Sequence, residues 1–402
     1  MSSVNFLEKL LDGVEVEWKT LGQTCKIETG KLNANAAVDD GEYMFFTTAK
    51  ETSKIDKFRW DTEALLIAGN ANVGEVKHYI GKFEAYQRTY VLTNFDENVS
   101  VRFLYFVLSH SLKKYLEERT NSAAMTYIVR STLENFPIPI PSPDNPEKSL
   151  AIQSEIVRIL DKFTALTAEL TAELTAELNM RKKQYNYYRD QLLSFDEGEV
   201  EWKALGEVGH IVTGRTPKSS DKSAWGDDVD FVTPSDIKNG MRNITCPSRR
   251  LSAEGAASMP KVRIPRGSLL VTCIGADMGK TVINANDCIP NQQINAITLS
   301  DDSVQVGYLF HILTAMRETL RRQGELGGGT MPLINKSDFS KIVVPIPSHE
   351  EQNRIAKILD KFDTLTNSIT EGLPREIELR QKQYEYYRDL LFSFPKPETV
   401  SN

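Results

Sequence analysis

The stretch that most constrains the fold of this chain covers residues 156–195, and its middle repeats Thr-Ala-Glu-Leu three times over residues 167–178. Ala, Glu and Leu favour a helix, Thr tolerates one, and no Gly or Pro interrupts the stretch. Because a helical turn takes 3.6 residues, each four-residue unit rotates its leucine by roughly 40°, and the leucines share one broad apolar face. One unit adds about 6 Å of helix. The repeat therefore predicts a helical spacer.

This helix has a twin later in the sequence. Ile159-Leu160-Asp161-Lys162-Phe163 recurs from Ile358, and Gln184-Tyr185-Asn186-Tyr187-Tyr188-Arg189-Asp190 recurs with one change from Gln383. Both copies lie 199 residues after their originals, so we expect two long helices of equal length that pair antiparallel. Opposite the repeats, the second helix carries Gly372 and Pro374. Gly ends helices and Pro begins them, which predicts a break near residues 372–374.

A second internal repeat precedes each of these helices. Val16-Glu17-Trp18-Lys19-Thr20-Leu21-Gly22 returns as Val200-Glu201-Trp202-Lys203-Ala204-Leu205-Gly206. Each copy opens a globular stretch that leaves through a Pro-rich segment, at residues 136–143 and 344–347, where no helix can persist. The chain therefore consists of two halves with one plan, a domain followed by a long helix.

Local patterns predict the elements inside the two globular stretches. Apolar runs predict strands at residues 65–68 and 268–272, each followed by a turn, at 69–74 and 275–280. Helical periodicity predicts helices at 101–119 and 306–322. The fold class is therefore α+β: two similar mixed α/β domains separated by a long antiparallel pair of helices. We expect an N-terminal helix with the lead-in to the first domain, the first domain, the first long helix, the second domain, the second long helix and a tail at residues 1–18, 19–148, 149–197, 198–348, 349–394 and 395–402.

Composition excludes several classes of protein. The net charge of −7 argues against a basic surface along the whole chain, so any contact with nucleic acid must come from local patches. Four scattered cysteines form no metal-type spacing and suit a reducing cytosol. We find no signal peptide, no stretch of ~20 apolar residues, no phosphate-binding or cofactor loop and no methyltransfer motif. These absences predict a cytoplasmic protein that is not an enzyme and holds no metal.

The sequence resembles the DNA-specificity subunits of type I restriction-modification systems over nearly its whole length. The motifs that carry the resemblance lie mostly in the second half: Thr213-Gly214-Arg215-Thr216-Pro217, Trp225-Gly226-Asp227, Val232-Thr233-Pro234-Ser235-Asp236, residues 275–280, Asn291-Gln292-Gln293, and a Pro-Ile-Pro segment leading to Glu351-Gln352. The first half departs from this pattern. Ala68-Gly69-Asn70 stands where the second half has Thr272-Cys273-Ile274, and Ile152-Gln153 replaces Glu-Gln.

The resemblance implies two target-recognition domains at opposite ends of an antiparallel helical pair. Such a subunit recognises a bipartite, asymmetric site in double-stranded DNA and directs adenine methylation and restriction by its partners. It implies two methyltransferase subunits and, in the full complex, two motor-nuclease subunits. S-adenosylmethionine, ATP and Mg would belong to those partners, and this chain would hold no cofactor. The Thr-Ala-Glu-Leu units resemble those of members that use such repeats to set the half-site spacing.

The chemistry of base recognition selects the candidate DNA-binding residues. Asn and Gln pair with adenine, Arg and Lys pair with guanine, and backbone contacts fix position. Polar residues in predicted turns and loops are Lys26, Lys31, Asn33, Asn35, Asn70, Asn72, Gln87 and Arg88 in the first half, and Arg215, Lys218, Ser219, Lys280, Asn291, Gln292 and Gln293 in the second. Taken singly, each is also explained as a turn-forming Asn or a solvated Lys.

Two questions stay open at the level of the sequence. The paired tyrosines either pack the helix ends or anchor a partner subunit, since aromatic residues and Arg are favoured at interfaces. They are Tyr185, Tyr187 and Tyr188 with Tyr384, Tyr386 and Tyr387. The alternative functions are a stand-alone bipartite DNA-binding regulator without enzymatic partners, and a coiled-coil scaffold that never meets DNA.

Overall fold

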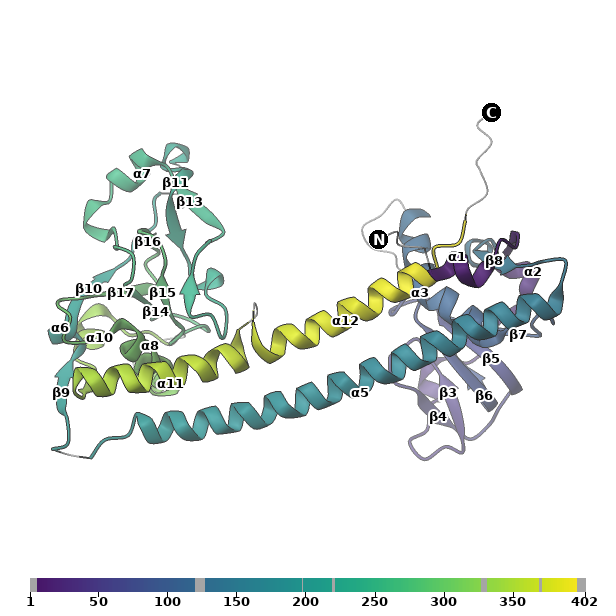
Figure 1. Cartoon of the computed structure of the whole chain (residues 1–402), viewed down its shortest axis with the longest axis horizontal. Helices are drawn as coiled ribbons and strands as arrows, with labels where there is room; N and C mark the ends of the chain where they lie inside the picture. Colours follow the sequence, from purple (N-terminus) through teal and green to yellow (C-terminus); the bar gives the residue numbers. More distant parts are fainter. Residues whose placement is uncertain are drawn as a thin grey trace. The chain divides into compact units, whose positions relative to one another are not determined.

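The computed structural model describes residues 6–119, 127–196, 198–218, 221–326, 331–368 and 371–395. The chain forms two compact units (Figure 1). The first unit contains Met1–Leu170 and Arg380–Asn402, and the second contains Thr171–Leu379. Two helices, α5 (Pro146–Leu192) and α12 (Gly372–Leu391), each contribute residues to both units. We expected these helices to be segments separate from the domains. In the structure the two ends of α5, and likewise the two ends of α12, belong to different units.

The first unit is built on a six-stranded sheet with the order β2-β7-β5-β6-β3-β4. Its neighbours run antiparallel except for the parallel pair of β3 and β6. Its elements before α5 are α1 (Phe6–Leu11), β1 (Val16–Thr20), α2 (Leu21–Thr24), β2 (Lys26–Thr29), η1 (Ala34–Ala36), β3 (Tyr43–Phe46), β4 (Ser53–Ile55), β5 (Trp60–Ala68), β6 (Val76–Ala85), β7 (Thr89–Thr93), α3 (Val101–Arg119), α4 (Arg130–Glu134) and β8 (Pro137–Pro141).

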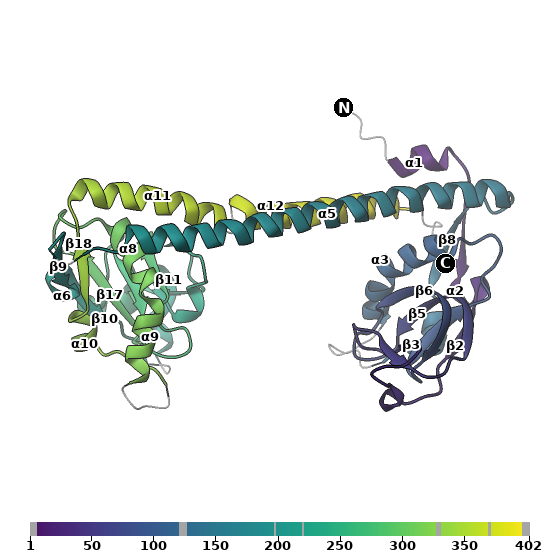
Figure 2. The ribbon, with the colours of Figure 1, turned by 90° about the horizontal axis from the view of Figure 1, so that it is seen from below.

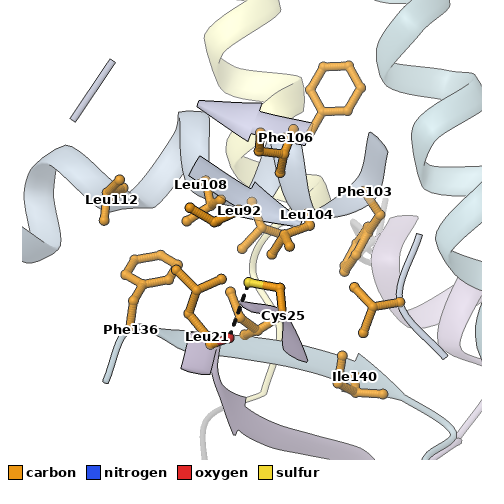
Figure 3. Packing of buried hydrophobic residues seen from close by; sticks show 14 of the residues in the cluster. Leu21, Cys25, Leu92, Phe103, Leu104, Phe106, Leu108, Leu112, Phe136 and Ile140 are labelled. Atoms are coloured by element: carbon orange, nitrogen blue, oxygen red, sulfur yellow. Dashed lines mark hydrogen bonds between the residues drawn. The ribbon is translucent and has the colours of Figure 1, made fainter. Parts of the chain in front are cut away.

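The second half of strand β5, residues 64–68, is buried on both faces of this sheet. Side chains alternate between the faces of a strand, so Leu65 and Ile67 enter one apolar cluster while Leu66 enters another. Helix α3 covers the first face, where it lies against β5 and β6 (Figure 2). Phe103 and Leu104 of α3 share this core with Leu92 of β7, and Figure 3 shows Leu104 beside Leu92. The continuous apolar run at residues 64–68 thus reflects the part of a central strand that has no solvent face.

The Pro-rich segment that leaves the first domain is a strand rather than a loop. Strand β8 pairs antiparallel with β1, and Trp18 lies opposite Pro139. Proline has no N–H to donate, and the alternating prolines of β8 leave it able to pair along one side, which ends the sheet at two strands. The second unit repeats this arrangement, with Trp202 opposite Pro345.

The second unit contains a five-stranded sheet of order β10-β17-β14-β15-β12, a three-stranded sheet of order β13-β11-β16, and the pair of β18 and β9. Its elements after α5 are β9 (Glu201–Ala204), α6 (Leu205–Val208), β10 (Gly209–Thr213), η2 (Lys222–Ala224), β11 (Trp225–Val232), η3 (Pro234–Asp236), β12 (Asn243–Ile244), β13 (Arg249–Leu251), α7 (Ala253–Ala257), η4 (Pro260–Val262), β14 (Leu269–Thr272), β15 (Thr281–Asn284), β16 (Cys288–Pro290), β17 (Ile294–Leu299), α8 (Val306–Ala315), α9 (Arg317–Glu325), α10 (Lys336–Ser340), β18 (Val343–Ile346) and α11 (His349–Asn367).

Strand β14 repeats the burial of β5. Leu269 and Val271 enter the cluster beneath α8, and Leu270 enters a second cluster on the opposite face. The helix expected at residues 306–322 is two helices, because ψ is 1° at Met316, between α8 and α9. Past this break the Arg317 guanidinium donates to the Asn239 side chain (3.1 Å). The break thus comes just before a tertiary contact of α9. The helical periodicity of the sequence continues through this point and does not reveal the break.

The long helices enter the cores of both units. Ile156 and Leu160 of α5 are fully buried in the first core, together with Leu391 of α12, and Ile355 and Leu359 of α11 are fully buried in the second. The Thr-Ala-Glu-Leu repeats lie within α5, which has no interruption between its ends.

The second long helix is interrupted, as its composition predicts. Helix α11 ends at Asn367 and α12 begins at Gly372. Gly372 has a φ of +76°, and a Cβ there would lie 2.4 Å from the carbonyl oxygen of Thr364, so only glycine fits. Pro374 follows in the first turn of α12, where its missing N–H costs nothing.

Candidate nucleic-acid interface

Each unit brings the ends of four chain segments together in a cluster of loops. The first loop cluster consists of residues 30–36, 69–75, 86–88 and 127–128, and the second consists of residues 214–218, 273–279, 291–293 and 332–334. Loops on a rigid sheet are where recognition residues usually lie. Most of the predicted DNA-binding residues fall in these two clusters.

A single residue joins three of the loops in the first cluster. The Gly69 N–H donates to the carbonyl of Arg88 (2.9 Å), and the Gly69 carbonyl accepts from the N–H of Ile128 (2.8 Å). The next residue, Asn70, forms an isolated antiparallel bridge with Tyr127. These bonds fix the three loops relative to one another.

The second cluster has the same bonds. The Cys273 N–H donates to the carbonyl of Gln293 (2.8 Å), the Cys273 carbonyl accepts from the N–H of Ile334 (3.0 Å), and Ile274 forms the bridge with Leu333. Gly69 and Cys273 are therefore equivalent, as the alignment of residues 68–70 with residues 272–274 implies. At these loops the two units share the same backbone bonds and differ in the side chains.

The third segment of each cluster is a tight turn. Residues 86–89 and 291–294 are each closed by a hydrogen bond from the last N–H to the first carbonyl, of 2.8 and 3.1 Å. Such a bond defines a β-turn with two central residues. The central residues of the two turns are all predicted DNA-binding residues: Gln87, Arg88, Gln292 and Gln293.

Glycine is required where the fourth segment crosses these turns. A Cβ at Gly30 would lie 1.8 Å from the carbonyl oxygen of Ala85, and one at Gly214 would lie 2.2 Å from that of Asn291. No side chain is compatible with such distances, so steric exclusion explains why the Thr-Gly-Arg motif has glycine at this position. The residue after it is basic and exposed in both units, Lys31 and Arg215.

The structure places the first-unit candidates unequally. The exposed ones are Lys26, Lys31, Asn33, Asn35, Asn72, Gln87 and Arg88, whereas Asn70 is half-buried. Lys26 lies outside the cluster, at the other end of β2, where its ammonium lies 3.0 Å from the Glu28 carboxylate and lowers the pKa of that group. The Asn72 amide donates to the carbonyl of Thr48 (2.8 Å). The Asn70 Oδ1 atom is buried and has no partner within the described part of the chain.

The side chains of two second-unit candidates are bonded to other groups of the protein. The Lys280 side chain is 13% exposed, and its ammonium contacts the Asp277 carboxylate (2.7 Å) and the carbonyl of Ile237 (3.0 Å). Asn291 is buried, and its amide donates to the Gln293 side chain (3.1 Å). Arg215, Lys218 and Gln292 are exposed, Gln293 is half-buried, and Ser219 lies outside the described residues. The contact of each candidate with DNA stays a prediction.

The tyrosines of the long helices divide into two groups. In the first unit Tyr387 stacks on Phe163 (5.3 Å between centroids, 10° between planes), and in the second Tyr188 stacks on Phe362 (5.6 Å, 27°). Each stack has its counterpart 199 residues away. Tyr185 is buried, and burial raises its pKa to about 12.

The other group contains the two most exposed of the six tyrosines. Tyr187 and Tyr386 are 62% and 61% exposed, and each contacts the edge of the next tyrosine ring. Tyr384 donates to or accepts from the Thr164 hydroxyl (3.1 Å), which places it with the packing group. Packing therefore accounts for four of the six tyrosines, and a partner subunit stays a prediction for Tyr187 and Tyr386.

Sequence reasoning missed the polar contacts that fasten each domain to its helix. Gln153 and Gln352 are fully buried and hold the loop before α3 or α8: Gln153 accepts from the Ser100 N–H (2.8 Å), and Gln352 accepts from the Gln305 N–H (2.9 Å). The 199-residue offset relates the two glutamines and could have identified them.

The aspartates of the Ile-Leu-Asp-Lys-Phe repeats make a second set of these contacts. In the first unit Asp161 pairs with Arg102 (2.6 Å). In the second, Asp360 accepts from both the His311 ring (2.7 Å) and the Arg242 guanidinium. The recurring motif thus has a structural role on the helix.

Three of the four cysteines are buried, and Cys246 is exposed. Burial raises the pKa of the Cys25, Cys273 and Cys288 thiols to about 12, so these thiols are protonated at neutral pH and poor nucleophiles. Within the described ranges no His, Cys, Asp and Glu side chains gather in threes or more to hold a metal ion. None of the helices in those ranges has the length and apolar character needed to span a bilayer.

Sequence comparison relates the chain to one family. The family model described as Type I restriction modification DNA specificity domain matches residues 13–180 and 197–379. The specificity subunit of the type I restriction enzyme EcoR124I/EcoR124II from Escherichia coli is 41% identical, and the match covers 100% of both chains. A putative specificity subunit from Haemophilus influenzae is 35% identical, with 97% of this chain and 98% of that protein covered.

Solved structures share the fold. The S subunit of a type I restriction-modification system from M. genitalium matches with a TM-score of 0.53 at 16% identity, covering 96% of this chain and 98% of that one. A chain from a study of complex assembly and conformational transition of the type I R-M system matches with a TM-score of 0.64 at 17% identity, covering 94% and 97%. These matches agree with an α+β fold that carries sheets in both halves.

Proposed function

This chain belongs to the family of type I restriction-modification DNA specificity subunits, and from that premise we propose that it reads a bipartite, asymmetric DNA site with one loop cluster on each half-site. It is a DNA-recognition subunit. The specific proposal is that the first unit reads one half-site, the second unit reads the other, and the bases between them are not read.

One observation carries the division into two readers. The two clusters have equivalent backbone bonds, centred on Gly69 and Cys273, but different side chains at the turn tips and bridges. A common scaffold with different donors and acceptors is what two readers of unlike sequences need, because base edges are distinguished by their donor and acceptor patterns. An asymmetric target follows from the unlike side chains.

Partner subunits would supply the chemistry. We propose two methyltransferase subunits that carry S-adenosylmethionine, and two motor-nuclease subunits that use ATP and Mg in the full complex. This chain would be non-catalytic. The exposed Tyr187 and Tyr386 occur once on each long helix, in the same motif, and would give each of two identical methyltransferase subunits an aromatic anchor.

The Thr-Ala-Glu-Leu repeats would set the length of the unread spacer. They lie inside the uninterrupted helix α5, so adding or removing a unit changes the length of a rigid element rather than of a loop. The break between α11 and α12 gives the second long helix a place to adjust.

The test is an exchange of reading units. Residues 19–141 are replaced by the corresponding segment of another family member, and methylated sites are mapped in cells that express the chain with its partners. One half-site should change while the other half-site and the spacer stay the same. The reciprocal exchange of residues 203–347 is the matched control and should change only the other half-site. A change in both half-sites after either exchange would refute the proposal of two readers.

A further inference from the structure

We propose that three of the four central residues of the two turns are base-reading residues: Arg88 binds a guanine, and Gln87 and Gln292 each bind an adenine. The proposal rests on the proposed function, because it requires each loop cluster to face a DNA groove. It goes beyond that function by assigning a base to a side chain in each half-site.

The geometry singles out these positions among the candidates. The turn 86–89 is held at its ends by the bond that closes it and by the bond from Gly69 to the Arg88 carbonyl. The Gln87 N–H is also bound, to the carbonyl of Leu32 (2.9 Å). The backbone of the turn is thus fixed on three sides while the Gln87 and Arg88 side chains are exposed. A rigid backbone with exposed polar side chains lowers the entropy cost of placing a donor against a base edge.

The second turn has the same design with different occupants. Gln292 is equivalent to Gln87 and is exposed, and its Oε1 atom accepts from the Thr216 hydroxyl. This bond orients the amide so that Nε2 can donate to a base. Gln293, equivalent to Arg88, is half-buried and accepts from the buried Asn291 amide (3.1 Å). Gln293 is therefore a positioning residue that holds its own turn, and Gln292 is the reader.

The residue types determine which base each position prefers. An Arg guanidinium donates two parallel hydrogen bonds to N7 and O6 of guanine, and a Gln amide donates to N7 and accepts from N6 of adenine. Contact of Arg88 with a phosphate is the competing explanation. The basic residue after each crossing glycine, Lys31 or Arg215, offers a phosphate contact at the same cluster, so the turn is free to read bases.

The experiment removes the acceptor from the base. The complex of the chain with its methyltransferase partners is bound to a duplex that carries its mapped site, and each guanine is replaced in turn by 7-deazaguanine, which lacks N7. At one guanine position, 7-deazaguanine should lower the affinity of the wild-type complex for the duplex about tenfold, which is the loss expected for one base contact. Arg88→Ala should bind the unmodified duplex about tenfold more weakly and lose nothing further on that substitution.

Matched variants separate base reading from other effects. Arg158→Ala removes an exposed arginine of α5 that pairs with Glu155 and should behave as the wild type. Gln87→Ala and Gln292→Ala should each become insensitive to 7-deazaadenine at one adenine, in different half-sites. Unchanged melting temperatures establish that the variants are folded.

Other results would overturn the assignment. A loss for Arg88→Ala that is equal at every sequence, with a salt dependence reduced by about one phosphate, would make Arg88 a phosphate contact. Persistent sensitivity of Arg88→Ala to the same 7-deazaguanine would place the guanine contact on another residue. Failure of the wild-type complex to prefer any site would refute the proposed function itself, which the modified bases do not test.

Discussion

Replacing Gln352 by Leu tests the idea that buried glutamines fasten each domain to its long helix. The side chain of Gln352 is fully buried. Its Oε1 accepts from the Gln305 N–H (2.9 Å), and its Nε2 donates to the carbonyls of Ser303 (3.0 Å) and Pro347 (2.9 Å). Leu has a similar volume but leaves the N–H of half-buried Gln305 without its acceptor. The carbonyls of exposed Ser303 and buried Pro347 lose their donor.

The expected loss follows from these three bonds. A buried group without its partner costs about 1–3 kcal/mol, and a lost hydrogen bond contributes about 1 kcal/mol. The three together should lower the free energy of unfolding of the second unit by about 3–5 kcal/mol. For a unit of this size the melting temperature should fall by about 10 °C.

The assay is urea unfolding combined with hydrogen exchange of the native chain. Exchange should accelerate in α8 and α11 of Gln352→Leu, and in α3 and the first turns of α5 of the equivalent variant Gln153→Leu. Gln381→Leu is the control, because Gln381 is exposed on α12. A loss below about 1 kcal/mol for Gln352→Leu, equal to that of the control, would refute the fastening role. Faster exchange in both units would refute its local character.

Three further predictions concern other parts of the fold. Deleting residues 175–178 shortens α5 by about 6 Å and rotates the rest of the helix by roughly 40°, close to the ~35° between successive base pairs. The unread spacer should therefore lose one base pair while both half-sites stay the same. An unchanged spacer in methylation maps would show that the repeat does not set the spacing. Burial raises the pKa of Asp363, so the wild type loses stability as pH rises from the ordinary carboxyl value of 3.8 through the raised one. Asp363→Asn should therefore melt higher at pH 7.5, with the advantage vanishing below pH ~4, and a difference that is constant with pH would contradict this cause. The double variant Tyr187→Ser and Tyr386→Ser should keep its melting temperature but bind methyltransferase about tenfold or more weakly in a titration of complex formation, as for an interface anchor, whereas unchanged binding would leave the tyrosines without that role.

The sequence predicts the parts of the fold that local patterns control. The helix expected at residues 101–119 is α3 with the same bounds, because a buried face recurs through its whole length. The strand at residues 65–68 is the end of β5, where every side chain is buried. The helix at residues 306–322 fails at Met316, because its direction changes where α9 contacts other loops of the second unit.

Some residues of the candidate site follow from the sequence and others do not, because local patterns do not reveal tertiary contacts. Residue type and loop position place Gln87, Arg88 and Gln292 at turn centres, where they are exposed. The same reasoning selects Lys280, whose charge is balanced by Asp277 three residues earlier. It also misses Tyr127, an exposed tyrosine beside Asn70, because the bridge that brings these two loops together is set by tertiary structure.

The first unit contains residues from both ends of the chain, and this affects how it can fold during synthesis on the ribosome. Its core is made from residues near both ends of the chain, since Leu391 and Phe394 pack with Phe103 and Leu104 of α3. The second unit, in contrast, is one continuous segment, Thr171–Leu379. A nascent chain can therefore complete its second reader while the first still lacks part of its core. A premature stop just after residue 379 would remove Leu391 and Phe394 from the core of the first unit and leave the second unit intact. We therefore expect such a truncation to weaken recognition of the first half-site and not of the second.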